Sequence, residues 1–139
     1  MTPRTWALAL GTGGTALALW ARPYGVGRVY QSVRNEADFN PLLSLGGILV
    51  ANFCILTDKT SQSVSKQIQQ QAMQYQLRVV DVELDEPGIA HLGQRYAISS
   101  IPTLVAFHGG NEVSRYIYKE PKGLDGLDMW MQSLSTVTS

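Results

Sequence analysis

The residues that could carry chemistry are few, and the first of them is a single thiol. Cys54 is the only cysteine of the 139-residue chain, which excludes an internal disulfide. A redox or nucleophilic role would require the thiolate form of this one residue. Its neighbours Phe53, Ile55 and Leu56 are apolar, and an apolar setting disfavours a thiolate. We therefore expect a buried cysteine, with a reactive thiol as the alternative.

The chain has few histidine and cysteine side chains that could bind a metal ion. His91 and His108 are its only histidines. With Cys54 they would supply three ligands, but their spacing follows no metal-binding motif and a structural zinc site has four ligands. We expect neither a metal site nor a cofactor.

Alternating strands and helices must position these residues. The apolar, branched run 48–56 predicts a central strand buried on both faces. Helical spacing of apolar residues over 61–76 predicts an amphipathic helix whose glutamines face mostly outward. The other expected elements are a helix over 37–45, a strand over 77–84, a short helix from Pro87, a hairpin of strands 103–107 and 113–118, and a terminal helix with Leu124, Leu127, Met131 and Leu134 inward. This order predicts an α/β fold with a central mixed sheet flanked by helices.

Several unrelated short motifs occur in the order in which thioredoxins carry them. They are Val82-Glu83-Leu84-Asp85-Glu86, Ile89-Ala90, Tyr96-Ala97-Ile98, Ile101-Pro102-Thr103 and Phe107-His108-Gly109-Gly110. On these motifs, residues 36–135 resemble the thioredoxin-like family. The resemblance implies a thioredoxin-like fold and a cis peptide bond between Ile101 and Pro102, beside the redox turn.

The redox turn itself departs from the family. It reads Thr57-Asp58-Lys59-Thr60-Ser61, with no cysteine. By resemblance, Asp58 and Ser61 take the places of the two redox cysteines, and Asn52 that of the family's buried carboxylate. A dithiol oxidoreductase needs one thiol to attack and a second to resolve the mixed disulfide. We therefore expect a degenerate redox turn without dithiol activity, with Asp58 or Thr57 capping the following helix.

The resemblance also implies a surface for holding an extended partner, made by the redox turn and the proline loop. The expected partner-binding residues on this surface are Ile55, Leu56, Thr57, Ser100, Ile101 and Pro102. Trp130 joins them because it lies, with Met129, off the inward stripe of the last helix. The alternative is that these residues only close the core.

The N-terminal segment has a composition of its own. All 11 acidic residues lie beyond residue 35, whereas residues 1–35 contain four arginines. The uncharged run 6–21, which begins at Trp6 and ends at Ala21, would reach only about 24 Å as a helix, against about 30 Å for a bilayer core. An acid-free, arginine-bearing leader is typical of mitochondrial targeting.

We expect a targeting or membrane-anchor segment over 1–35 and the thioredoxin-like domain over 36–139. The expected location is the mitochondrial inner membrane or matrix; the alternative is the secretory pathway.

The remaining chain is mildly acidic and has no clustered lysines or arginines. Binding to nucleic acid depends on such clusters, so nucleic acid is not an expected partner.

The sequence favours a redox-inactive structural or adaptor protein that binds other proteins in a mitochondrial, membrane-associated assembly. The alternatives are a monothiol oxidoreductase that uses Cys54 and a non-catalytic client-binding domain of the secretory pathway.

Overall fold

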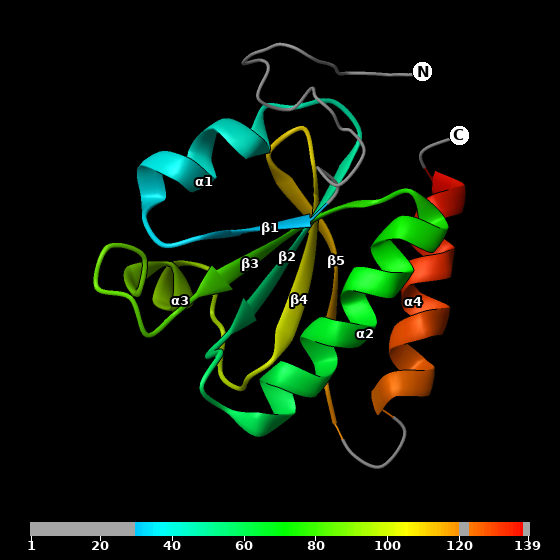
Figure 1. Cartoon of the computed structure of the whole chain (residues 1–139). Coiled ribbons are helices and arrows are strands. Elements are labelled where there is room, and N and C mark those ends of the chain that lie inside the picture. Colours follow the sequence, from blue (N-terminus) through cyan, green and yellow to red (C-terminus); the bar gives the residue numbers. More distant parts are fainter. Residues whose placement is uncertain (1–29, 120–122, 138–139) are drawn as a thin grey trace, which may run out of the picture. The chain divides into compact units, whose positions relative to one another are not determined.

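The computed structural model describes residues 30–119 and 123–137. Strands and helices alternate along them (Figure 1) in the order β1 (Tyr30–Val33), α1 (Glu36–Leu43), β2 (Ile48–Cys54), α2 (Lys59–Tyr75), β3 (Arg78–Glu83), α3 (His91–Arg95), β4 (Thr103–His108), β5 (Asn111–Ile117) and α4 (Gly123–Val137). The predicted α/β order is confirmed, and β1 is a strand that the sequence did not predict.

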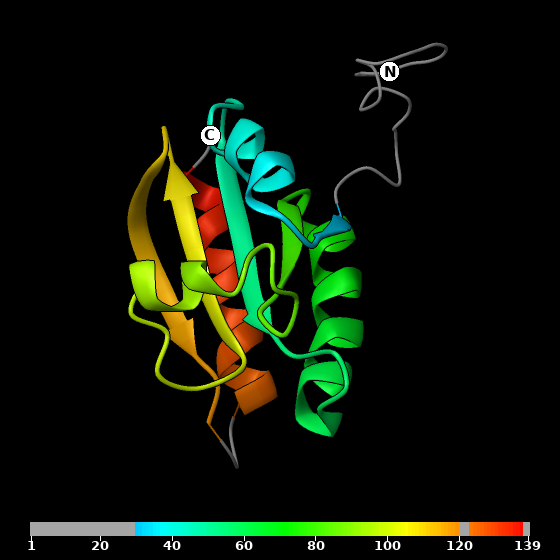
Figure 2. The same cartoon turned by 90° about the vertical axis from the view of Figure 1, so that its left-hand side faces the viewer.

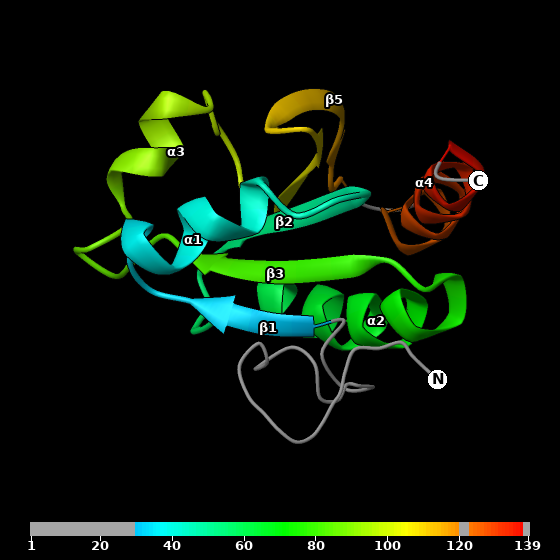
Figure 3. The same ribbon diagram turned by 90° about the horizontal axis from the view of Figure 1, so that it is seen from above.

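The five strands form one mixed sheet in the order β1-β3-β2-β4-β5. The central strand β2 runs parallel to β3, with Ala51 beside Val80, and antiparallel to β4, with Ala51 beside Val105. Helices α1 and α3 cover one face of this sheet and α2 and α4 the other (Figures 2 and 3). Because both faces are covered, every residue of β2 is buried, as the apolar run predicts.

The hairpin between β4 and β5 turns on two glycines. Gly109 and Gly110 have φ values of 62° and 82°, the left-handed region that a tight hairpin turn requires at both central positions. The predicted hairpin is confirmed, although β5 begins at Asn111, two residues earlier than expected. A register shift between Ala106 and Phe107 marks a bulge in this pair of strands.

The two faces of the sheet carry different cores. Beneath α1 and α3, the rings of Phe39, Phe53, Tyr96 and Phe107 pack edge-on or tilted, with centroids 5.3–6.4 Å apart. The other core includes apolar residues of α2 and α4, namely Val64, Ile68, Ala72, Leu127, Met131 and Leu134, all buried. These positions follow the inward stripes that the helical spacing predicts. The prediction is wrong for Leu124, which lies in the first turn of α4 and is 40% exposed.

One glutamine of α2 does not follow the predicted outward pattern. Gln71 is only 1% exposed, and its side-chain amide donates to Asp128 of α4 at 3.2 Å. Tyr75 donates to the same carboxylate at 2.9 Å. The prediction is wrong for Gln71 because α2 packs against α4 as well as against the sheet.

The predicted leader falls largely outside the described residues. Residues 1–29, including the run 6–21, belong to the part that is not described, whereas 30–35 form β1 and the cap of α1. In the described part of the chain, no helix combines the length and the apolar character that a membrane crossing requires.

Candidate functional site

Two loops from distant parts of the chain meet at one end of the sheet. In the pairing of β2 with β4, Phe53 lies beside Thr103. Since Cys54 ends β2 and Pro102 precedes β4, the segment after β2 and the segment before β4 leave the sheet side by side. Edge strand β5 ends here too, because Tyr118 donates its backbone amide to Pro102 at 3.2 Å.

The helix that follows β2 begins with a carboxylate cap. Asp58 has extended backbone angles, and its Oδ2 accepts a hydrogen bond from the amide of Ser61 at 2.9 Å. The predicted cap is confirmed, with Asp58 in that position. The hydroxyl of Ser61 is buried and accepts from the amide of Ile55 at 3.4 Å. Both residues at the expected dithiol positions are thus used to hold the turn in place.

The loop before β4 has the expected geometry. The peptide bond between Ile101 and Pro102 is cis, as the resemblance implies. Thr103 donates its hydroxyl to the carbonyl of Ser100 at 2.7 Å, which ties the loop to the start of β4. Pro102 is buried, Ile101 is half-buried and Ser100 is exposed.

Cys54 is fully buried, as expected, with 0% of its surface exposed. Its Sγ lies 3.9 Å from the carbonyl oxygen of Val82. Burial raises the pKa of this thiol far above its usual range, and the negative charges of Asp81, Glu83 and Asp85 raise it further. A thiol in this setting is a poor nucleophile.

A buried carboxylate lies beside Asn52, and it comes from β3. Asp81 is 3% exposed and accepts a hydrogen bond at 2.8 Å from the side-chain amide of Asn52, its partner in the register. Asn52 also donates to Ser65 of α2 at 3.4 Å. The sequence reasoning missed Asp81; the signal was an acid within the apolar strand Val79-Val80-Asp81-Val82.

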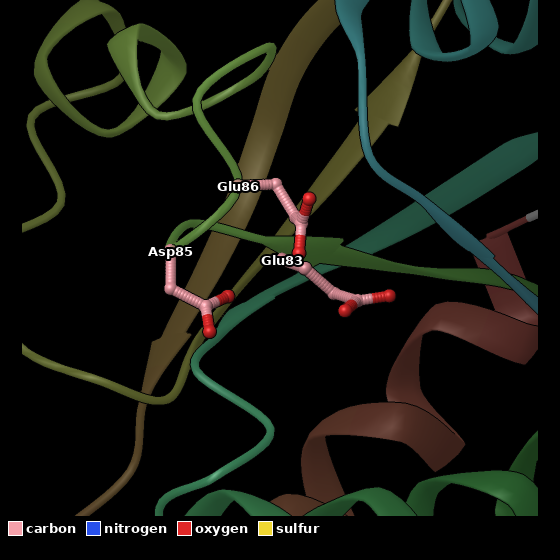
Figure 4. A group of neighbouring side chains, drawn as sticks. All are labelled: Glu83, Asp85 and Glu86. Atoms are coloured by element: carbon pink, nitrogen blue, oxygen red, sulfur yellow. The ribbon is translucent and has the colours of Figure 1, made fainter.

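Three further carboxylates gather where β3 ends. The side chains of Glu83, Asp85 and Glu86 each offer an oxygen within 4.8 Å of the others (Figure 4). Glu83 accepts hydrogen bonds from the hydroxyl of Ser32 in β1 and from Nε of Arg34, the residue after β1, the latter at 3.3 Å.

The two histidines are not brought to Cys54. Nε2 of His91 lies 2.5 Å from a carboxylate oxygen of Glu36, on the side of the sheet that α1 and α3 cover. His108 pairs with Ile48 at the opposite end of β2 from Cys54.

Trp130 lies apart from the two loops. Its Nε1 donates to the hydroxyl of Ser114 at 2.8 Å, and its ring packs on Tyr116 with centroids 5.9 Å apart. The indole is half-buried against the middle of β5, whereas neighbouring Met129 is 71% exposed. A partner-binding role for Trp130 stays a prediction.

Comparison with known proteins gives matches in structure only. No protein-family model matches the chain, and no curated protein matches it. Among solved structures, a mutant thioredoxin of Halobacterium salinarum NRC-1 matches with a TM-score of 0.68 and 19% identity, covering 81% of this chain and 96% of that one. Thioredoxin O2 of Arabidopsis thaliana in its oxidized state matches with a TM-score of 0.68 and 22% identity over 78% and 96%. Thioredoxin of Trypanosoma brucei brucei matches with a TM-score of 0.68 and 15% identity over 84% and 96%.

The chain has the thioredoxin fold. At these identities the likeness is one of fold alone. Within that fold, this chain carries a single cysteine, at the end of β2, so it has no dithiol motif.

Proposed function

We propose that this thioredoxin-fold protein is a redox-inactive adaptor, which binds a segment of another protein without forming a disulfide. The observation that carries the proposal is the bond between Asp58 and Ser61 at 2.9 Å. A carboxylate cap occupies the helix N-terminus where an attacking thiolate would be stabilised. The only cysteine lies buried at the end of β2.

The binding site in this proposal is the surface formed by the two adjoining loops. We call it the docking surface and define it as Ile55, Leu56, Thr57, Ser100, Ile101 and Pro102. Three of its apolar residues, Ile55, Leu56 and Ile101, are half-buried, so part of each side chain faces solvent. Apolar side chains beside loop backbone are suited to holding an extended segment.

The assembly in this proposal is mitochondrial and membrane-associated. The support is the composition of residues 1–35, which hold arginines and no acid and include the uncharged run 6–21. Such a segment fits a mitochondrial address or a retained anchor.

The experiment that tests the proposal measures the native size of the endogenous protein. Membranes are solubilised gently, the particle size is determined, and the N-terminal residue of the same sample is read. We expect migration in a particle much larger than the 15.2 kDa chain. Migration at monomer size would contradict the adaptor proposal.

A matched pair of variants connects the particle to the docking surface. Ile101→Asp places a negative charge on one of the half-buried apolar residues of the docking surface. Ser99→Asp places the same charge on an exposed residue that lies just outside the docking surface. We expect the first variant to leave the particle and the second to remain in it.

A further inference from the structure

We propose that the docking surface selects an extended segment that carries lysine or arginine beside its apolar residues. This inference rests on the proposed function and adds the chemistry of the partner.

The end of β3 adjoins the docking surface directly. The backbone amide of Leu84 donates to the carbonyl of Cys54 at 2.9 Å. Asp85, whose side chain is exposed, follows Leu84 in the chain. Ile55, the first residue of the docking surface, follows Cys54. Asp85 and Ile55 therefore lie on either side of the same backbone contact. Asp85 is also one of the nearby negative charges that, after burial, raise the pKa of Cys54 at the end of β2.

The negative charge beside the docking surface is only partly compensated. Glu83 forms an ion pair with Arg34. Among the described residues, Asp85 and Glu86 take part in no ion pair, although their carboxylates lie within 4.8 Å of that of Glu83. Carboxylates crowded in this way repel one another, and a cation brought by a partner relieves the repulsion.

Apolar side chains and a negative charge are therefore available next to each other. Ile55, Leu56 and Ile101 offer contact to apolar side chains, and Asp85 borders them with an exposed negative charge. A segment with lysine or arginine next to its apolar residues complements both features, whereas an acidic segment would meet like charge.

The test uses the full chain and three synthetic peptides. The peptides share a core of alternating valine and threonine and differ in their flanks, which are lysine pairs, serine pairs or glutamate pairs. Binding is followed by NMR through the amide signals of Ile55 and Ile101. We expect the lysine-flanked peptide to bind about two- to fivefold more tightly than the serine-flanked one for each lysine engaged, and the glutamate-flanked peptide to bind most weakly. The difference should shrink between about 50 mM and about 500 mM salt because exposed charges are screened.

Two variants with the same change of charge locate the preference. Asp85→Asn should reduce the preference for lysine flanks at least twofold. Asp125→Asn, on the exposed first turn of α4, should leave it unchanged. Unchanged melting temperatures show that both variants are folded.

The possible failures are separable. If none of the three peptides shifts the signals of Ile55 and Ile101, the docking surface of the proposed function is wrong. If all three bind there equally, the docking surface stands and the selectivity for basic segments is wrong. If Ca²⁺ alone shifts Asp85 and Glu86 and abolishes the preference, the carboxylates serve a metal ion and the inference is likewise overturned.

Discussion

The carboxylate of Asp58 accepts a hydrogen bond from the backbone amide of Ser61 at 2.9 Å. By resemblance these two residues stand where thioredoxins carry their two redox cysteines. The contact is a helix cap, so the position that would hold a reactive thiolate instead holds a structural carboxylate. The positive end of the helix favours either anion.

The cap should contribute measurably to stability. Asp58→Ala removes the acceptor of the Ser61 amide, and we expect it to lower the free energy of unfolding by about 1 kcal/mol. Asp58→Asn keeps a capping oxygen and should recover most of that loss. Denaturant unfolding of both variants checks this, and equal losses would show that the cap contributes little.

A thiol introduced at the cap should be more reactive than the native one. In a Cys54→Ser background, Asp58→Cys places a thiol at the N-terminus of α2, where the helix lowers a thiol pKa below its usual value of about 8.5. The matched control is Ser63→Cys in the same background, on the exposed surface of α2. We expect the thiol introduced at position 58 to be alkylated faster at pH 7. Equal rates would mean that this helix end does not stabilise an anion.

The native thiol should be protected by the fold. Burial and nearby carboxylates raise the pKa of Cys54, so its alkylation in the folded chain should be slow at neutral pH. Unfolding in denaturant should accelerate it at least about tenfold, since a fully exposed thiol titrates near 8.5. Rapid alkylation of the folded protein would revive the monothiol alternative.

A glycine of α4 should resist substitution although it lies within a helix. A Cβ on Gly126 would lie 2.5 Å from the hydroxyl oxygen of Tyr116. This hydroxyl donates a hydrogen bond to the carbonyl of Gly123 at 2.7 Å, and the ring of Tyr116 packs on Trp130, so the side chain is held on both sides. Alanine normally favours a helix by about 1 kcal/mol over glycine. Here we expect Gly126→Ala to destabilise the protein instead, by about 1–3 kcal/mol.

Thermal unfolding and indole fluorescence would test this expectation. The control is Gly46→Ala, because a Cβ at Gly46 meets nothing within 4 Å. A more stable Gly126→Ala variant would show that Tyr116 moves aside at no cost.

Helices α1 and α3 should be coupled by a pH-dependent contact. Glu36 accepts from Arg95 at 2.6 Å and lies 2.5 Å from His91, and these contacts lower the pKa of its carboxyl to about 2. Its unfolded value is about 4.3, so the stabilisation is complete above that pH and is lost as the pH falls toward 2.

The measurement is the melting temperature against pH for the native chain and for Glu36→Gln. We expect a small deficit of the variant at pH 7, since the contact is partly exposed, and a deficit that shrinks as the pH falls through about 2. A deficit that persists unchanged near pH 2 would assign it to packing.

The alternation of elements could be predicted because each carries its own local signal. The branched run of β2 and the inward stripe of α2 identify these elements from neighbouring residues alone. The short strand β1 has no such signal. It is defined by its place beside β3, which a reading of local pattern does not provide.

The candidate site could be predicted only in part. The cap at Asp58 and the burial of Cys54 follow from a few adjacent residues. The hydrogen bond between Asn52 and Asp81 depends on the register of β2 with β3, and Gln71 is buried because of a helix that comes more than fifty residues later. Contacts between distant elements set these features, so local periodicity could not reveal them.

Redox inactivity is tested by an insulin-disulfide reduction assay on the full chain with dithiothreitol as reductant, beside an active thioredoxin. We expect turnover no higher than that of dithiothreitol alone, and no change on Cys54→Ser. Turnover above this background that is abolished by Cys54→Ser would contradict it and identify the buried thiol as catalytic.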